Sequence, residues 1–543
     1  MDEEPAKPSA SHLEMEEHQP LFLRRDRELS VIDTIKTHWR AMLLCTVPFT
    51  AGAMFGYDTV VNGASISMPS FLLYFGEQDP STGALYLPSL WTSLWTAMSS
   101  LAQAISATGT GILADRVGRR WSACIAGVVS VAGASIQYTA HSRGALLAGK
   151  MVSGAGIGMA ITSAMTYASE IVPPRLAPTV QRAMVVFILV MQGVAMGVIR
   201  AFVPDMQEKA FRTVLGIQWG VGGLVTAAFG AAPESPVYNI TNGHHQRAEK
   251  LFAWLYPDPT DRSERYTHLL KTIEEEQQRN KTQNQDQNQD QNQDSDPQQT
   301  PTPTPDRARY IECFQGPNIK RTLTMMFLFS IVNLGGAPFL AQSIYFLTSV
   351  GLPAIHVFDI SIGGFGLAVV IILASGILLQ RVKRRNTVFW GCIVNLVLNL
   401  VIGCLHYAPG NGPKWAIAIL MNILISLQAS LLQSPGWSIA SEISSYRLRA
   451  KSMSLGLMAQ TFTTWLITFI VPYLYNVDSG NLGARTGLVF AGASALLVWG
   501  AWVLVPDTTG LATEDIDRCY EAGVPVRRFG GVGPGLERAP MEG

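Results

Sequence analysis

The chain has 543 residues, of which 48% are hydrophobic and only 15% are charged, and its formal net charge is zero. Soluble globular proteins carry about 25% charged residues, so this composition indicates a chain that lies largely in lipid. The balance of basic and acidic residues excludes the excess positive charge of a nucleic-acid-binding protein, and we expect no nucleic-acid partner. The six cysteines are scattered without CxxC spacing, which argues against a disulfide framework or a zinc module.

Twelve stretches of the chain are long and apolar enough for a membrane-spanning helix, which needs about 20 such residues. The polar, acidic first 30 residues predict no cleavable signal peptide. In the first half the spans lie near 41–64, 88–113, 121–139, 144–169, 180–202 and 213–232. In the second half they lie near 323–349, 357–380, 387–406, 414–441, 452–475 and 485–506. The predicted fold is an all-α membrane protein with twelve transmembrane helices in two six-helix bundles, a layout typical of transporters.

These spans divide the chain into five regions. They are a tail over 1–40, a first bundle over 41–232, a central loop over 233–322, a second bundle over 323–506 and a tail over 507–543. Lys and Arg gather before span 1 and after spans 2, 8, 10 and 12, so both termini and the central loop are predicted to be cytoplasmic. Within that loop, the QNQD repeat from Gln283 to Asp294 has no apolar residue to bury and is expected to be disordered.

The loop between spans 2 and 3 carries the most specific motif. It reads Gly111-Ile-Leu-Ala-Asp115-Arg116-Val-Gly118-Arg119-Arg120. The glycines permit a tight turn, the arginines suit the cytoplasmic side, and Asp115 can cap or pair with a helix end of the other bundle. The motif resembles the loop motif of the major facilitator superfamily, and this resemblance implies the major facilitator fold.

Further motifs are similar to those of the sugar-porter branch of that superfamily. They are Tyr167-Ala-Ser-Glu170-Ile-Val-Pro173, Pro233-Glu-Ser-Pro236, Glu442-Ile-Ser-Ser-Tyr-Arg447-Leu-Arg449 and Pro506-Asp-Thr-Thr-Gly510. Details such as Gln218-Trp219 and Cys313-Phe-Gln-Gly316 resemble the fungal α-glucoside (maltose-type) proton symporters. The resemblance extends from about residue 40 to 530. It implies a small-molecule substrate, a surrounding lipid bilayer, a proton gradient in place of any cofactor, and a monomer.

Two charged residues lie inside the predicted spans, Asp58 in span 1 and Lys150 in span 4. A charge at bilayer depth is costly unless it is paired or solvated, so we expect the two to pair. The resemblance implies that they form the proton-coupling site, with Lys150 at the family's arginine position. Protonation of Asp58 would then release Lys150 and loosen span 1 against span 4. The alternative is a static buried ion pair that only fixes packing.

The same resemblance implies a salt-bridge network at cytoplasmic helix ends, which closes that side in the outward-open state. Its members are Asp115, Arg119, Arg120, Glu170, Glu234, Arg384, Arg385, Glu442 and Arg449. The chain lacks two of the family's arginines, at Ala177 and Val237, and its second-half copy of the loop motif lacks the Asp and the Gly. We therefore expect a smaller network than is usual in the family.

Binding of sugar hydroxyls needs amide or carboxylate partners and an aromatic ring face. Three of the family's amide positions are occupied here by Val185, Val332 and Gly364. The candidate substrate-binding residues that remain are Gln192, Asn333, Gln433, Trp437 and Gln460, with Asn62 and Gln342 as further polar candidates. Each amide could instead form an ordinary interhelical hydrogen bond. The missing amides imply a drier cleft that favours a less polar ligand.

Three functions remain open from the sequence. The first is proton-coupled transport of a sugar or glycoside by alternating access in a fungal plasma membrane. The second is transport of a non-sugar small molecule, for example export of a fungal secondary metabolite, which the apolar substitutions favour. The third, a non-transporting sugar sensor, is less favoured because the tail after residue 507 is short. No nucleotide-binding, hydrolase or metal-ligand pattern occurs, so we expect neither an enzyme nor a metal site.

Overall fold

The structure is a computed structural model, and it describes residues 29, 31–78, 83, 85–173, 176–274, 313–349, 351–378, 382–443, 449–509 and 513–531. The predicted QNQD repeat lies outside these residues. The described chain is helical apart from turns and one two-stranded antiparallel sheet of β1 (Glu77–Gln78) and β2 (Leu85–Tyr86), in which Glu77 pairs with Tyr86.

Six long helices form the first half. They are α5 (Thr46–Ala64), α7 (Ser89–Val117), α8 (Arg119–Tyr138), α9 (Arg143–Ile171), α10 (Ala177–Phe202) and α11 (Glu208–Ala231). The short helices α3 (Val31–Thr37) and α4 (Trp39–Leu44) precede them, and α6 (Pro69–Phe75) follows α5. Gly118 separates α7 from α8 with a φ of +102°, a backbone conformation that favours glycine.

The second half contains six spans, of which two are interrupted. Its helices are α15 (Pro317–Leu334), α16 (Ala337–Ala341), α17 (Ser343–Ser349), α18 (Ala354–Leu378), α19 (Arg384–Cys404), α20 (Gly412–Gln428), α21 (Ser434–Ile443), α22 (Arg449–Tyr475) and α23 (Thr486–Leu504). The seventh span, predicted as one helix over 323–349, begins at Pro317 and breaks between α15 and α16. The tenth passes from α20 to α21 through a π-helical turn over Ala429–Gln433.

Glycine causes the break in the seventh span. Gly336 has a φ of +99°, which an α-helix cannot accommodate. The Gly335 carbonyl, which lacks a helical partner there, accepts hydrogen bonds from Asn395 Nδ2 at 3.1 Å, Asn399 Nδ2 at 3.4 Å and Gln428 Nε2 at 3.0 Å. The break is therefore a built feature, because a buried main-chain acceptor without such partners would be destabilising.

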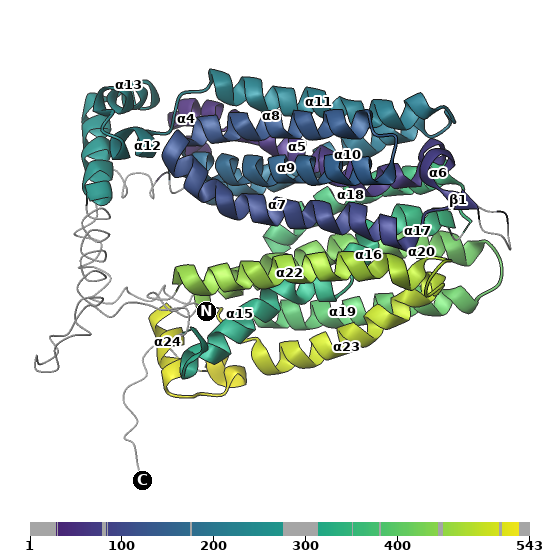
Figure 1. Ribbon diagram of the computed structural model, residues 1–543. Coiled ribbons are helices and arrows are strands. Elements are labelled where there is room, and N and C mark those ends of the chain that lie inside the picture. Colours follow the sequence, from purple (N-terminus) through teal and green to yellow (C-terminus); the bar gives the residue numbers. More distant parts are fainter. Residues whose placement is uncertain are drawn as a thin grey trace, which may run out of the picture.

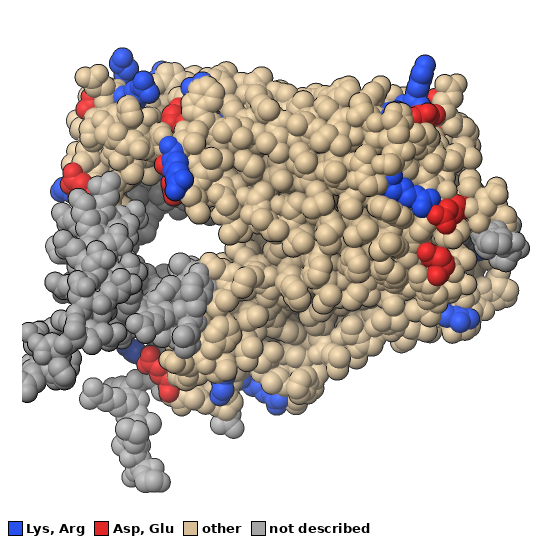
Figure 2. Space-filling model, viewed as in Figure 1, with Lys and Arg blue, Asp and Glu red and all other residues tan. Residues whose placement is uncertain are grey.

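The helices have the dimensions and surface of a membrane protein. Ten helical stretches in the described residues are long and apolar enough to cross a bilayer. Helices α5 and α7 are outside that set but pack among the others, α5 against α10 and α7 against α9, so each half supplies six spans (Figure 1). Charged side chains gather at the two ends, with an uncharged band between them (Figure 2). The predicted twelve-helix, all-α architecture is confirmed.

Smaller helices cover one end of the molecule. Helices α12 (Pro236–Thr241), α13 (His245–Leu255) and a helix over 259–274 follow the first half, within the segment that the sequence presented only as a polar loop. Beyond the second half, α24 (Thr513–Glu521) packs on α21 and α15. We call this the α12 end of the molecule and the opposite one, which carries α6 and β1, the strand end (Figure 1).

The buried core shows how the two halves meet. One apolar cluster at the strand end combines residues of both halves, such as Phe71 and Leu87 with Phe339 and Tyr345. Toward the α12 end there are two separate clusters, one around Tyr167 and Phe229 of the first half and one within the second half. The halves are therefore joined at the strand end and apart at the α12 end, where Figure 2 shows a hollow between them.

Candidate functional site

Asp58 lies in the middle of α5 and is only 6% exposed. Its Oδ1 accepts hydrogen bonds from Gln218 Nε2 of α11 at 2.8 Å and from Ser153 Oγ of α9 at 3.1 Å. Gln137 of α8 donates in turn to Gln218 Oε1 at 3.3 Å. The carboxylate is thus held by neutral donors from neighbouring helices of the first half.

Lys150 on α9 is 1% exposed and binds a different part of α5. Its Nζ donates to Asn62 Oδ1 at 2.6 Å and to the Asn62 carbonyl at 3.0 Å. Asn62 Nδ2 donates to Ser99 Oγ of α7 at 2.7 Å.

The direct contact between Asp58 and Lys150 that we expected is not formed: in the described part of the chain, Lys150 has no ion pair with a carboxylate. Asn62 is four residues after Asp58, so the ammonium group lies about one helical turn away from the carboxylate. Within this turn of α5, a cation and an anion are both buried and each is hydrogen-bonded to neutral groups. The two charges remain near enough to compensate one another electrostatically.

The predicted network residues of the first half converge at the α12 end. Arg119 Nε lies 3.0 Å from Glu170 Oε1, and Arg119 also pairs with Asp115 at 3.2 Å. Glu170 accepts a hydrogen bond from the Ser235 hydroxyl. Glu234 Oε1 accepts from the backbone N–H of Arg120 at 3.1 Å and of Ser235 at 3.0 Å. The Pro233–Pro236 motif is thus tied to the loop motif.

The second half carries a smaller counterpart. Arg384 pairs with Glu442, and its backbone N–H donates to Thr509 Oγ1 at 3.1 Å. Arg385 donates to the Trp502 carbonyl at 3.0 Å. The side chain of Arg449 lies outside the described residues.

Among the described residues, every pair of this network lies within one half, and none links the two halves. The reason is the separation of the halves at the α12 end. A network between the halves needs the outward-open state, for which it was predicted, so the arrangement here leaves that prediction untested.

The contacts that do link the halves lie at the strand end. The Leu87 N–H donates to Tyr345 Oη at 2.9 Å, and Asn476 Nδ2 donates to the Leu87 carbonyl at 2.5 Å. Asp478 accepts from the backbone N–H of Ser89 at 2.8 Å and from its hydroxyl. We call this set the seam. On another side, Arg200 of α10 pairs with Asp359 of α18 at 2.8 Å.

Two amides expected near a substrate are instead bound to the protein. Asn333 Nδ2 on α15 donates to Thr464 Oγ1 at 2.7 Å and to the Gln460 carbonyl at 3.2 Å, both on α22. Gln342 Oε1 accepts from Tyr475 Oη at 3.0 Å. Both side chains are buried. In this conformation they connect helices, as the alternative interpretation of such amides states.

The remaining candidates are available to a ligand. Gln192 on α10, Gln433 in the π-helical turn and Gln460 on α22 are partly buried, and no side-chain hydrogen bond of theirs occurs among the described residues. Trp437 on α21 is 43% exposed, and its ring packs at 5.7 Å from the ring of Phe329. A π-helical turn widens a helix locally and is frequent at functional sites. The second half therefore presents an aromatic face with amides nearby.

The comparisons with known proteins agree with this architecture. A model of the family "Sugar (and other) transporter" matches residues 44–520. The chain belongs to that family.

Individual relatives cover most of the chain. The MFS transporter fmqE of Aspergillus fumigatus is 38% identical over 94% of this chain and 92% of its own length. A general alpha-glucoside permease of Saccharomyces cerevisiae is 23% identical over 93% of this chain and 79% of its own length. Among solved structures, the inward open conformation of the xylose transporter XylE from E. coli matches with a TM-score of 0.65 at 16% identity, covering 88% of this chain and 99% of that one. This likeness shows the fold.

Sequence reasoning missed one amide of this transporter. At Gly364 of α18, where the family resemblance led us to expect an amide, an added Cβ atom would collide with the side chain of Asn422 on α20. Asn422 therefore occupies the space that a larger residue at 364 would need, and it supplies an amide from a neighbouring helix. Its Nδ2 donates to the Ala418 carbonyl at 2.9 Å. The only hint in the sequence was a lone Asn in an apolar span.

Proposed function

We propose that this member of the family is a proton-coupled transporter of a sugar or glycoside that works by alternating access. In this proposal it is a monomer in a plasma membrane, it needs no cofactor besides the proton gradient, and it catalyses no reaction. The α12 end, with the arginine-rich loop motif, faces the cytoplasm by the positive-inside rule. The conformation described above is then inward-facing.

The observation that carries the proposal is the environment of Asp58. A buried carboxylate that has only neutral hydrogen-bond donors in contact can take up a proton without breaking an ion pair. A protonated carboxyl group would no longer attract the Lys150 charge, so protonation would change the balance of forces between α5 and α9. Intramembrane ionisable groups commonly form the proton relays of transporters.

Alternating access requires two arrangements of the halves about one cavity. The seam and the shared core at the strand end support one of them, because they close that side and leave the α12 end open. In the other arrangement the seam would open, and the charged residues at the α12 end would meet across the halves. Arg119, Glu170, Arg384 and Glu442 are the residues with charges suited to that closure.

Sugar binding in the cavity is supported by Trp437 with the amides of Gln192, Gln433 and Gln460. An aromatic face can pack against a sugar ring, and free amides can bind hydroxyls. Asn333 would join them only if its hydrogen bonds to α22 were exchanged.

The test is uptake of radiolabelled maltose and glucose into transporter-null yeast that express the protein, at acidic and neutral external pH. Wild type should show acid-stimulated uptake, and Asp58→Asn should abolish it. Asp205→Asn is the matched control, because Asp205 is an exposed residue in the connection between α10 and α11 and should leave uptake unchanged. Absence of uptake with the protein confirmed at the cell surface would refute transport of these sugars.

A second function, movement of a non-sugar metabolite, is favoured by one observation. The amides of Asn333 and Gln342 are engaged within the protein, and Val185 and Val332 stand where the family resemblance led us to expect further amides. Such a cavity offers few partners for hydroxyls and an exposed indole for an aromatic ligand. Energy-dependent efflux of the aromatic dye rhodamine 6G from the same yeast, reduced at least tenfold by Asp58→Asn, would support this alternative, and equal dye retention with and without the protein would count against it.

A further inference from the structure

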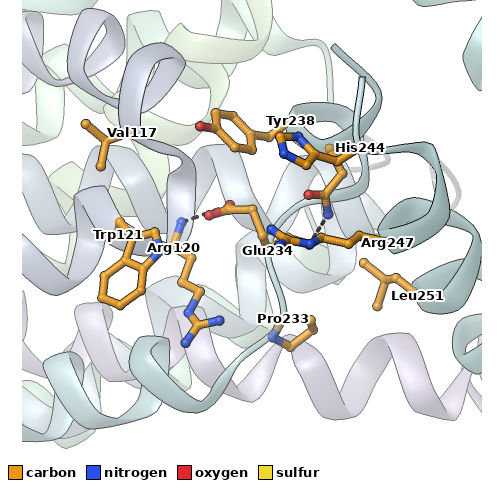
Figure 3. Close-up of a pocket in the computed structure, with 10 residues that line it drawn as sticks. Val117, Arg120, Trp121, Pro233, Glu234, Tyr238, His244, Arg247 and Leu251 are labelled. Carbon is orange, nitrogen blue, oxygen red and sulfur yellow. Dashed lines mark hydrogen bonds between the residues drawn. The ribbon is translucent and has the colours of Figure 1, made fainter. Parts of the chain in front are cut away.

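A pocket separate from the transport path lies at the α12 end, between the start of α8 and the helices that follow the first half. Its volume is 580 Å³, and its walls include Arg120, Trp121, Glu234, Tyr238, His244 and Arg247 (Figure 3). Arg120 and Trp121 come from α8, whereas Arg247 comes from α13. The pocket therefore joins a membrane-spanning helix to a helix outside the membrane.

The pocket has an excess of positive charge. Two guanidinium groups and an imidazole face one carboxylate, Glu234, which already accepts two backbone N–H groups. Arg120 Nε is buried and has no hydrogen-bond partner. Arg247 is exposed, and the described residues give its guanidinium no ion pair or hydrogen bond. Several strong donors thus remain available to an anion.

The pocket lies beside the lipid-facing surface of α8. Trp121, Ile125 and Val128 are exposed and recur at helical spacing, so they mark the face that α8 turns toward lipid. Trp121 is in the first turn of the helix, where a tryptophan suits the membrane–water interface. Arg120 lies next to it, with its guanidinium 5.0 Å from the centre of the indole ring. The donors are therefore at the depth of lipid headgroups.

We propose that this pocket binds the phosphate group of an anionic phospholipid in the adjoining leaflet, with Arg247 and Arg120 as the donors. Guanidinium groups bind phosphate oxygens through paired N–H donors, and basic pockets beside membrane helices suit anionic headgroups. A soluble phosphate offers the same chemistry, but the exposed apolar strip that leads to the pocket favours a ligand with acyl chains. Occupancy would bridge α8 and α13.

The test measures melting temperature of the purified full-length protein in nanodiscs of phosphatidylcholine, with and without a fraction of phosphatidylserine. A parallel series in detergent adds inorganic phosphate. Arg247→Gln removes a donor, and Arg247→Lys keeps the charge but loses the paired N–H geometry. Lys250→Gln is the matched control, because Lys250 lies on the same helix, is exposed and does not line the pocket.

We expect phosphatidylserine to raise the melting temperature of wild type and of Lys250→Gln. Arg247→Gln should weaken the apparent lipid affinity about tenfold or more, as expected for the loss of a charge-assisted hydrogen bond, and Arg247→Lys should be intermediate. A response to inorganic phosphate that Arg247→Gln removes would identify a soluble phosphate as the ligand. No response to either ligand, or the same response in Arg247→Gln as in wild type, would overturn the proposal.

Discussion

Gln218 donates a hydrogen bond of 2.8 Å to Asp58, 160 positions earlier in the chain. The contact joins α11 to α5 in the centre of the first half, in a region where a free carboxylate would be costly. Because Gln218 also accepts a hydrogen bond from Gln137, the carboxylate is connected to a chain of amides. That connection positions Asp58 without any contact to a cation.

The first prediction concerns the charge balance of Asp58 and Lys150. Lys150→Met removes the cation and leaves Asp58 as an uncompensated buried charge, so we expect a loss of about 3 kcal/mol of stability. The double variant Asp58→Asn/Lys150→Met should recover most of this loss, because it removes both charges, yet it should not transport. Thermal unfolding of the purified variants, followed by tryptophan fluorescence, measures the effect. Losses that simply add would show that the two charges do not interact.

The second prediction concerns the seam. Ser479 Oγ lies 2.9 Å from Ser89 Oγ, and a disulfide needs two sulfurs about 2.05 Å apart with only small adjustments. In a background in which the exposed Cys404 is replaced by serine, Ser89→Cys/Ser479→Cys should form a disulfide under mild oxidation. The cross-link should stop transport, and a reductant should restore it.

The two single-cysteine variants serve as controls for the seam and should transport normally in oxidant. If the double variant kept its full activity while the disulfide was shown by mass spectrometry, the seam would not need to open during transport.

The third prediction concerns the two glycines of the loop motif. Gly118 has a positive φ, and a Cβ atom there would meet the Glu234 carboxylate. Gly118→Ala should therefore cost about 2 kcal/mol or more. Gly111 lies inside α7 with open space around it, so Gly111→Ala should be neutral or stabilising by up to about 1 kcal/mol. Melting temperatures of the two variants, compared under identical conditions, decide the matter, and equal shifts would contradict the assignment.

The fourth prediction concerns Gly364 and Asn422. Gly364→Ala forces the Asn422 side chain to move, and we expect a loss of about 2 kcal/mol from overpacking. Gly363→Ala is the matched control, because nothing lies near the position of its added Cβ atom. Adding Asn422→Ser to Gly364→Ala should restore the melting temperature. Failure of that rescue would mean that another neighbour resists the substitution.

Local features of the sequence predicted the architecture well. Apolar stretches and the loop motif around Asp115 report on single helices and their ends, so the twelve spans follow from them. The cluster of Arg119, Glu170 and Glu234 at one end of the first half also follows, because these residues close spans that end on the same side of the membrane.

Features that depend on distance in space were beyond the sequence. Lys150 was expected to contact Asp58, but a residue position says nothing about which turn of a neighbouring helix a long side chain reaches. The seam joins Leu87 to Tyr345 and Asn476, and no local pattern pairs such distant segments. Asn422 fills the space over Gly364 for the same reason: the packing of two helices decides which of them supplies the amide.

The break in the seventh span has a mechanical consequence. At Gly335 the helical hydrogen bond of the main chain is already replaced by amide side chains of α19 and α20. Tilting α16 and α17 away from α15 would therefore rupture no further main-chain hydrogen bond. The resistance to such a tilt comes from side chains, above all from Tyr345 and its partners, so Gly335 and Gly336 act as a pivot whose stiffness can be tuned by single substitutions at its far end.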